Sequence, residues 1–209
     1  MRTSTVFADG NYFQPTSVPS INSNGRGGPG TSGFTAGAQG GYNYQIGNWV
    51  LGLETDFGYF DQDASRRVSA IYPCCSPATY TIEQKIDTDN LFTLRPRAGW
   101  AANNWLFYVT GGLALSSLKT NFEFTDIFGV AADGGKTSIK PGWTVGGGVE
   151  FGLARNWTVR GEYLYVDFDD VSLKSSNLAL GGFLSPGNVF THKADLSSHI
   201  ARVALNFRF

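Results

Sequence analysis

The sequence predicts an all-β protein, an antiparallel up-and-down barrel that crosses a membrane with its strands. Seven segments alternate apolar residues with polar or small ones over roughly ten positions, which is the length of a tilted spanning strand. Short and long connections between these segments also alternate along the chain. The third observation is a composition of 27 Gly, 16 Phe, 9 Tyr and 5 Trp in 209 residues. This mixture suits strands, tight turns and the aromatic girdles of a membrane barrel.

Charge and hydropathy exclude other classes of protein. The chain has 16 Lys plus Arg against 17 Asp plus Glu, so neither a basic nucleic-acid footprint nor an acidic disordered tail is present. No segment approaches the roughly 18 to 20 consecutive apolar residues of a spanning helix, which excludes a helical membrane protein. The length fits a single all-β domain.

The seven segments begin near residues 34, 49, 92, 105, 143, 157 and 201. In the clearest of them, Trp143 and Val145 share one strand face, while Thr144 and Glu150 share the other. The segment from residue 157 departs from the pattern, because its polar face becomes apolar at Leu164 and beyond. A bulge or an apolar layer in the barrel interior would explain this change.

The connections predict which ends of the strands face which side of the membrane. Residues 46–48, 103–104 and 154–156 are tight turns, whereas residues 61–88, 121–137 and 171–195 are expected to be long loops. Short turns on the periplasmic side and long loops on the outer side are typical of bacterial outer-membrane barrels.

The polar strand faces carry charges that decide between a membrane barrel and a soluble one. A soluble barrel would turn its apolar faces inward, and a one-residue slip in register would exchange the two faces. Four acidic residues and five arginines share the polar faces, and in a narrow lumen they would pair and offset the cost of burial. We therefore expect lipid to meet the apolar faces and an interior ion-pair network to plug the barrel, formed by Glu54, Asp56, Arg95, Arg97, Glu150, Arg160, Glu162, Arg202 and Arg208.

Seven strands are an odd number, whereas bacterial single-chain barrels have an even one, so eight are expected with the first weak or missing. The first strand lies either in residues 1–9 or upstream of Met1, and upstream is favoured. Residues 1–32 are then a flexible outer loop or a weak first strand, and residues 33–209 form the barrel. The N-terminus has no apolar core of a secretory signal, so we expect a mature, truncated or mis-started chain.

Several motifs carry a resemblance to a known family over roughly residues 33–209. They are Gly40 to Asn43, Trp49 to Asp56, Tyr108 to Ala114, Gly142 to Glu150, Asn156 to Trp157, Glu162 to Asp167 and the ending Ala201 to Phe209. In order and spacing they resemble the small opacity-type or immunogenic outer-membrane proteins, often labelled porin-family, including the RopB type. The resemblance implies an eight-stranded barrel in the outer membrane of a Gram-negative bacterium. It also implies that the assembly machinery of that membrane reads Phe209.

Two features depart from the pattern of that family. The usual first strand is absent, which bears on how the barrel closes. Pro96 lies within a spanning strand and removes one hydrogen-bond donor from the ladder.

Residues with catalytic chemistry are few. His199 lies near Asp195, Ser197 and Ser198, which would suit a hydrolase or acyltransferase site at the rim, but polar rim residues are the simpler interpretation. His192 lies in an expected loop and has a similarly weak claim. Glu54 and Asp56 are better explained as structural ion pairs than as catalytic carboxylates. We expect no cofactor and no metal.

Cys74 and Cys75 are adjacent in an expected outer loop, in an oxidising location if the chain is exported. A vicinal disulfide, a bond between two molecules and two unpaired thiols all remain open at this stage.

The sequence thus predicts a structural surface protein without catalytic activity. Its expected partners are outer-membrane lipid and lipopolysaccharide, the assembly machinery, and a host or cell-surface ligand of the loops; nucleic acid is not expected. The alternatives are a small porin-like channel and, less favoured, a lipid-modifying enzyme at the rim. Because eight strands enclose an interior that side chains just fill, a water-filled pore is disfavoured.

Overall fold

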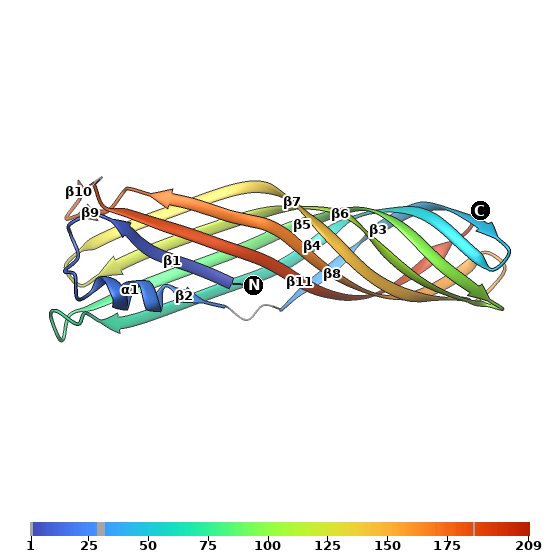
Figure 1. The fold of residues 1–209 in the computed structure, drawn as a ribbon, viewed down its shortest axis with the longest axis horizontal. Coiled ribbons are helices and arrows are strands. Elements are labelled where there is room, and N and C mark those ends of the chain that lie inside the picture. Colours follow the sequence, from blue (N-terminus) through green and yellow to red (C-terminus); the bar gives the residue numbers. More distant parts are fainter. Residues whose placement is uncertain (1, 29–31, 186) are drawn as a thin grey trace.

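The protein forms a long cylinder of β-strands in the computed structural model, which describes residues 2–28, 32–185 and 187–209 (Figure 1). The elements are β1 (Arg2–Asp9), α1 (Val18–Asn24), β2 (Arg26–Gly27), β3 (Ser32–Ile46), β4 (Trp49–Ile71), β5 (Thr79–Ala102), β6 (Trp105–Asp126), β7 (Val130–Gly152), β8 (Trp157–Ser175), β9 (Ala179–Leu180), β10 (Phe183–Leu184) and β11 (Val189–Phe207).

All neighbouring strands are antiparallel, in the order β2-β1-β11-β8-β7-β6-β5-β4-β3. The all-β up-and-down fold class is therefore confirmed. Tight turns join the strands at one end, as expected from residues 46–48 and 103–104. Gly47 and Asn103 have left-handed backbone there, with φ of 60° and 53°, which Gly and Asn tolerate better than other residues.

The strands are far longer than the ten positions expected, and the three predicted long loops are mostly strand. β4 to β7 contain 22 to 24 residues each. At the far end the long strands are joined by residues 72–78, by residues 127–129 and by a segment that contains β9 and β10. Residues 61–88, for example, continue the ladder between β4 and β5 up to the pair Ile71 and Thr79. Alternation persists in these segments, but with apolar residues facing inward, so they do not look like lipid-facing strands.

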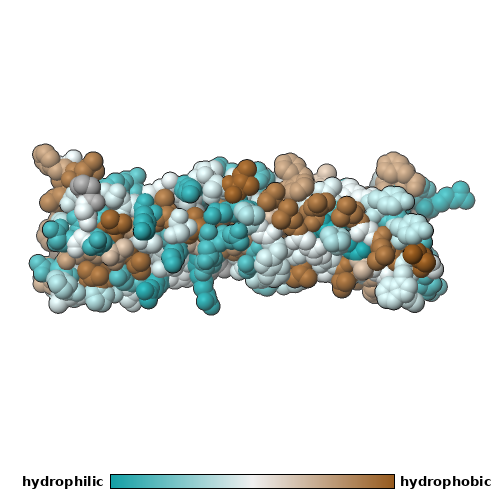
Figure 2. Space-filling view, turned by 45° about the horizontal axis from the view of Figure 1, so that its top comes forward, coloured by the Kyte–Doolittle hydropathy of each residue, from teal (hydrophilic) through white to brown (hydrophobic). Residues whose placement is uncertain are grey.

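The long strands therefore divide into two regions with opposite patterns. In the region we call the membrane belt, which runs in β4 from Trp49 to Tyr59, apolar and aromatic side chains face outward. In the region beyond it, which we call the outer extension, polar residues such as Asp61 and Asp63 face outward while Phe60 and Ala64 are buried. Figure 2 shows brown side chains gathered over the belt and teal side chains next to them near the middle of the cylinder.

Two apolar clusters fill the interior of the outer extension. The middle cluster lies next to the belt and contains Phe60, Ala64, Ile86, Leu91, Ala114, Leu118, Leu164, Val166, Phe168, Val171, Ala194, Leu196 and Ile200. The outermost cluster contains Phe7, Phe13, Ile21, Tyr72, Ala78, Tyr80, Ile82, Phe122, Phe124, Val130, Ala132, Leu178 and Phe190. The inward face of β8 becomes apolar at Leu164 because its side chains form this interior layer, which is one of the two explanations that the sequence offers.

Part of the segment expected as a flexible loop takes part in the outermost cluster. Phe13 and Ile21, the latter on α1, are buried in it. Thr5 N donates to Gly25 O over 2.8 Å, and Arg66 Nη1 on β4 donates to Asn24 O over 2.7 Å. The outer extension is thus bridged between β1 and β4 by α1 and β2.

The membrane belt has an open seam within the described residues. β1 pairs with β11 only from Asp9 beside Val189 to Arg2 beside Asp195, so residues 2–9 form a strand beside the outer half of β11 alone. Towards Phe207, β11 pairs with β8 but not with β3. A side-chain hydrogen bond of 2.5 Å from Gln39 to Asn206 crosses this seam. A strand upstream of Met1 stays a prediction.

Among the described residues, no helix is long and apolar enough to cross a membrane.

Candidate functional site: the interior charge network

Cross-strand register places the predicted charges opposite one another inside the membrane belt. Glu54 on β4 lies beside Arg95 on β5, Glu150 on β7 beside Arg160 on β8, and Glu162 on β8 beside Arg202 on β11. Side chains of such pairs point to the same face of the sheet, which here is the lumen. The strand ladder itself therefore assembles the network.

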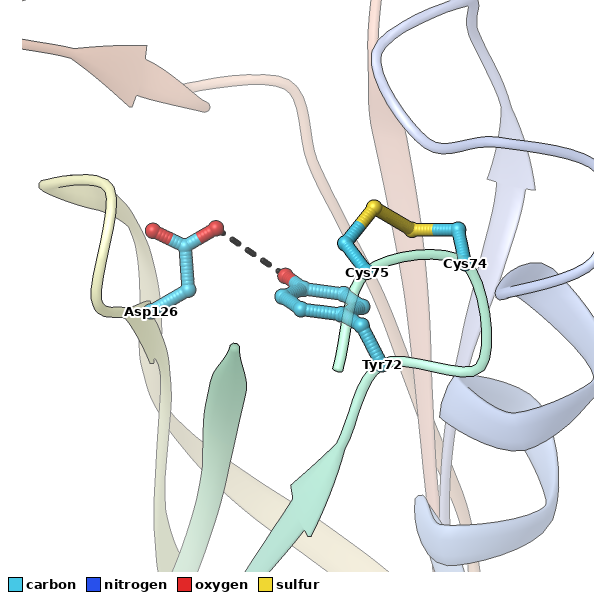
Figure 3. Close-up of a disulfide and its surroundings, with 4 residues drawn as sticks. All are labelled: Tyr72, Cys74, Cys75 and Asp126. Atoms are coloured by element: carbon cyan, nitrogen blue, oxygen red, sulfur yellow. Dashed lines mark hydrogen bonds between the residues drawn. A yellow bond between two sulfur atoms is a disulfide. The ribbon is translucent and has the colours of Figure 1, made fainter. Parts of the chain in front are cut away.

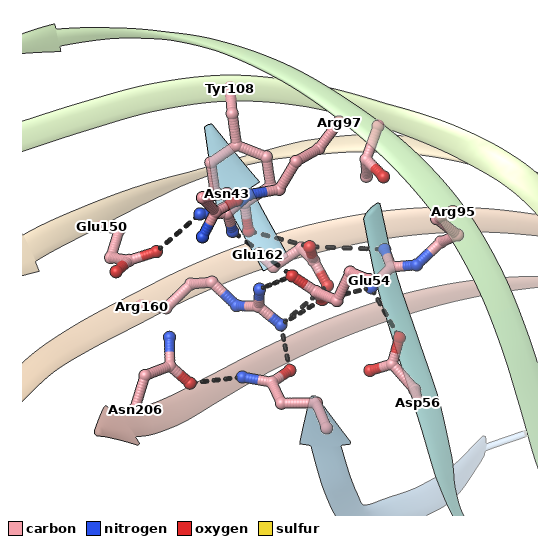
Figure 4. A network of polar contacts seen from close by, with 12 residues as sticks. Asn43, Glu54, Asp56, Arg95, Arg97, Tyr108, Glu150, Arg160, Glu162 and Asn206 are labelled. Carbon is pink, nitrogen blue, oxygen red and sulfur yellow. Dashed lines mark hydrogen bonds and ion pairs between the residues drawn. The ribbon is translucent and has the colours of Figure 1, made fainter. Parts of the chain in front are cut away.

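Glu54 is the centre of the network (Figure 4). The Arg160 guanidinium binds both of its carboxylate oxygens, with Nη1–Oε2 and Nη2–Oε1 distances of 2.6 and 2.8 Å. Arg95 Nη2 lies 2.8 Å from Oε1, and Arg97 Nη1 lies 3.2 Å from Oε2. Bidentate charge-assisted contacts of this kind are among the strongest hydrogen bonds in proteins.

Asp56 and Glu162 form a second acidic pole. Arg202 Nη2 lies 2.6 Å from Asp56 Oδ1 and 2.5 Å from Glu162 Oε2, so it bridges the two carboxylates. Arg95 contacts the same two groups, with N–O distances of 2.7 and 3.3 Å. The phenol of Tyr108 donates to Glu162 over 2.8 Å.

Glu150 connects the network to the end of the barrel that carries the tight turns. Its carboxylate lies 3.4 Å from Arg97 and 3.6 Å from Arg208, and it accepts a hydrogen bond of 2.7 Å from Thr158. The Arg208 side chain is 59% exposed, whereas the other eight predicted residues lie inside the lumen. The structure thus brings all nine predicted residues together, with Arg208 at the rim.

Sequence reasoning missed several neutral members of the network. Gln39 and Asn43 on β3 accept hydrogen bonds from Arg160 and Arg97. The Tyr108 ring lies under two guanidinium groups, with Arg97 Cζ 4.9 Å and Arg160 Cζ 5.8 Å from its centroid. All three residues lie on the polar faces of their strands, so the register that found the charges would also have found them.

A cavity of about 940 Å³ lies beside the network where the seam is open. Strands β3 and β11 line it together with Glu54, Glu150, Arg160 and Arg202. Its chemistry is that of paired carboxylates and guanidinium groups, without a hydroxyl or thiol nucleophile beside a base among these residues.

Above the network, the lumen is closed by layers of different polarity. The middle apolar cluster comes first. A polar layer follows, in which Gln84 Nε2 donates to Thr5 over 2.6 Å and His192 lies between Thr5 and Ser175 at 3.2 and 2.8 Å. The outermost apolar cluster lies beyond it. Burial lowers the pKa of His192 to about 4, so its imidazole is neutral at neutral pH.

The candidate rim site around His199 is divided between the two faces of β11. His199 faces outward at the edge of the belt, where its Nδ1 lies 2.5 Å from the Tyr163 hydroxyl. Ser198 points inward and donates to Gln62 over 2.5 Å. The strand alternation therefore separates His199 from Ser198, as expected for polar residues at the rim.

Cys74 and Cys75 form a vicinal disulfide at the tip of the β4–β5 hairpin (Figure 3). Of the alternatives left open by the sequence, the structure shows the bond within one chain. Tyr72 below it is buried, and its hydroxyl donates to Asp126 over 3.0 Å.

Comparisons with known proteins agree with this architecture. The model of the outer membrane protein beta-barrel domain matches residues 6–184. The chain is 35% identical to a 31 kDa outer-membrane immunogenic protein of Brucella melitensis, over 85% of this chain and 67% of that protein. It is 33% identical to a 22 kDa outer membrane protein of Rhizobium leguminosarum, over 72% of this chain and 61% of that protein.

A solved structure is also similar, but too distantly to carry an argument. It is Ail, the attachment invasion locus protein of Yersinia pestis, in complex with the heparin analogue sucrose octasulfate. The match has 13% identity and a TM-score of 0.25, and it covers 86% of this chain and 95% of that one. The family model and the two sequence relatives agree with the belt of outward-facing apolar side chains. This chain therefore belongs to the outer-membrane β-barrel proteins, with the immunogenic outer-membrane proteins among its relatives, and it is located in the outer membrane.

Proposed function

We propose that this protein is a non-catalytic surface protein whose filled barrel holds long hairpins above the outer membrane. The observation that carries the proposal is a lumen occupied by side chains along its length, apart from the cavity beside the open seam. A network of carboxylates and arginines occupies the belt, and two apolar clusters with a polar layer between them occupy the outer extension. Such an interior serves as a rigid support rather than as a path for solutes.

The outer extension argues against the channel alternative. The cavity of about 940 Å³ lies in the belt, next to Glu54 and Arg160, but Leu164, Val166 and Phe168 are almost completely buried above it. Ions crossing the barrel would have to pass these apolar layers without a polar partner, at a large cost in free energy.

Conductance in planar lipid bilayers tests the proposal against the channel. We expect no stepwise current from the refolded protein over the range of potentials at which a general porin, added to the same bilayer as a positive control, opens. Steps that grow in number with the amount of this protein, and that vanish when it is boiled before addition, would establish a channel and refute the filled-barrel function.

The surface that would meet other molecules is the outer end of the cylinder. Its hairpin tips carry exposed apolar side chains, namely Ile127, Phe128, Leu180, Phe183 and Leu184. Relatives are named immunogenic proteins, and we propose that these tips are the antigenic and adhesive part of this protein, in contact with lipopolysaccharide or with a host or neighbouring cell.

Replacing Phe183 and Leu184 with Ser tests this surface, since both lie in β10, away from the barrel interior. We expect less binding of antibodies raised against the folded protein, and less adherence of cells displaying the variant, with an unchanged folded band in electrophoresis. The matched control is Ser172→Ala, on the outer wall of β8. Unchanged antibody binding and unchanged adherence would refute the role of the tips.

We also propose that Phe209 is the assembly signal read by the outer-membrane assembly machinery. The residue is fully exposed beyond the end of β11, with its ring 5.2 Å from that of Phe207, so it contributes little to packing. Phe209→Ala is expected to lower the amount of assembled protein in cells without changing refolding of the purified chain in detergent. Equal loss in both settings would assign Phe209 a structural role instead.

A further inference from the structure

The Cys74–Cys75 disulfide differs from a crosslink that joins distant parts of a chain. A disulfide stabilises a fold mainly by restricting the unfolded chain, and the effect grows with the number of residues in the closed loop. Here the two cysteines are neighbours in sequence, so no loop of chain is closed. Something other than chain entropy must explain two oxidised cysteines at this position.

The turn that carries the disulfide is held by other interactions. Tyr72 N donates to Ala78 O over 2.8 Å, Cys75 N to Tyr72 O over 3.2 Å and Ala78 N to Cys75 O over 2.8 Å. Tyr72 and Ala78 are buried in the outermost cluster, and the Tyr72 hydroxyl donates to Asp126 (Figure 3). These contacts do not involve the sulfur atoms, so none of them depends directly on the bond between the two cysteines.

Both cysteines are also open to reagents. Cys74 and Cys75 are exposed, together with Pro73, Ser76 and Pro77, at the outer tip of the hairpin. No charged residue lies between Tyr72 and Thr79, so an incoming thiolate meets no fixed negative charge on the turn itself. The chain contains no other cysteine, so the pair has no alternative partner within the molecule.

We propose that this vicinal disulfide is a thiol-acceptor site, at which the protein forms a mixed disulfide with a thiol outside the cell. A thiolate attacks one of the two sulfur atoms, a new S–S bond forms, and the Cys74–Cys75 bond breaks. The other cysteine leaves as a thiolate and takes a proton from water. The sulfur of the incoming thiol is oxidised and the departing cysteine is reduced, so no further oxidant is required.

The incoming thiol is either a small molecule or a cysteine on a protein surface. The neighbourhood of the turn favours the protein, because it is apolar. Ile71 and Phe128 are exposed beside it, and the Phe128 ring lies 6.3 Å from that of Tyr72. The inference rests on the outer-membrane location and does not depend on whether the lumen conducts.

The test is exchange on the folded protein in detergent, with two probe thiols. One is glutathione, and the other is a peptide with a single cysteine between apolar residues. After the reaction, free thiols are trapped with N-ethylmaleimide. The mass of the proteolytic peptide that contains residues 72–79 is then measured by mass spectrometry. We expect one cysteine to carry the probe and the other to carry the maleimide. The probe thiol should react with the protein disulfide no more slowly than it reacts with glutathione disulfide. Faster reaction of the peptide assigns the site to protein thiols, and faster reaction of glutathione to small ones.

The matched controls are Cys74→Ser and Cys75→Ser, which contain no disulfide and therefore cannot accept a reduced probe thiol. The double variant and the reduced protein are expected to keep the urea midpoint of the oxidised protein. Three results would overturn the proposal. The first is two free thiols in the isolated protein, and the second is a reaction of the probe thiol with the protein disulfide at least about tenfold slower than its reaction with glutathione disulfide. The third is a lower urea midpoint after reduction, which would make the bond structural.

Discussion

The membrane belt and the outer extension are built from the same strands, but their polarity is opposite: the belt is apolar outside and polar inside, and the outer extension is polar outside and largely apolar inside. In the belt, outward side chains such as Leu53 are apolar, while Glu54 and Asp56 face the lumen. Beyond Tyr59 on the same strand, Asp61 faces outward and Phe60 fills the interior. The surroundings explain the difference, because lipid surrounds the first region and water the second. Each face of the sheet takes the polarity that its surroundings require.

The two regions also differ in what limits their interiors. The charge network tolerates no unpaired member, because an isolated buried charge costs several kcal/mol. The apolar clusters tolerate no charge and no void, because they are close-packed. The following substitutions test this contrast, from the largest expected effect to the smallest.

Leu164→Glu is expected to prevent folding. It places a carboxylate in the middle cluster, where Leu164 is completely buried among apolar side chains. Electrophoresis of unboiled against boiled samples after refolding should then show no shifted, folded band. Ser172→Glu, on the outer wall of the same strand, should fold like the parent chain. A normal folded band for Leu164→Glu would show that the interior here is not apolar.

Arg160→Met is expected to cost about 3 to 5 kcal/mol of unfolding free energy, because it removes the bidentate partner of Glu54 in the centre of the network. Urea titration in detergent, followed by tryptophan fluorescence, measures the loss. Adding Glu54→Gln should recover part of it, since the lumen then again holds as many carboxylates as guanidinium groups. Arg208→Met, at the exposed rim, is the control and should change little. Equal costs for the two arginines would contradict the network.

Val109→Arg is expected to cost about 2 to 4 kcal/mol, the effect of an arginine that faces lipid near the middle of the bilayer. Val109 is 66% exposed on β6, between Trp105 and Leu113 in the belt. Asn121→Arg, on the outer extension of the same strand, should be nearly neutral. Urea titration in lipid vesicles compares the two variants. Similar costs for both would place the boundary of the belt elsewhere.

His192→Gln is expected to remove the pH dependence of the unfolding free energy rather than to lower that free energy strongly at neutral pH. The pKa of His192 falls from 6.5 to about 4 on folding, so the unfolded chain binds a proton that the folded chain does not. Stability from this group is therefore complete above pH 6.5 and is lost as the pH falls towards 4, by up to about 3 kcal/mol.

The glutamine variant should show a flatter profile of unfolding free energy against pH in this window. Lys193→Gln, at the next and outward-facing position, should keep the profile of the parent chain. A profile of His192→Gln as steep as that of the parent would assign the pH dependence to other groups.

Strand register could be predicted from the sequence because alternation is local. The faces of Glu54, Arg95 and Glu162 follow from residue parity within each strand, and cross-strand pairing then brings them together. The same parity makes an apolar layer one of the two explanations for the loss of polarity at Leu164. The structure agrees with these predicted faces because the charged side chains lie inside the lumen, where they contact one another.

The length of the strands could not be predicted by the same reasoning. A search for outward apolar faces ends where lipid ends, so it predicts a loop at residues 61–88, although the ladder continues there up to the pair Ile71 and Thr79. Nor could α1 be predicted, because a helix of seven residues with little amphipathic pattern depends on tertiary contacts such as those of Ile21. The closure of the outer extension by residues 2–27 depends on contacts between segments far apart in sequence.

The inversion of the two regions can be tested most directly with spin labels on β6, in the Cys74→Ser and Cys75→Ser background. Val109→Cys and Asn121→Cys carry the label, and the protein is reconstituted in lipid vesicles. We predict that the label at residue 109 is relaxed by oxygen and shielded from a water-soluble nickel chelate, and that the label at residue 121 shows the reverse. Equal access of the chelate to both labels would contradict a membrane belt that ends partway along these strands.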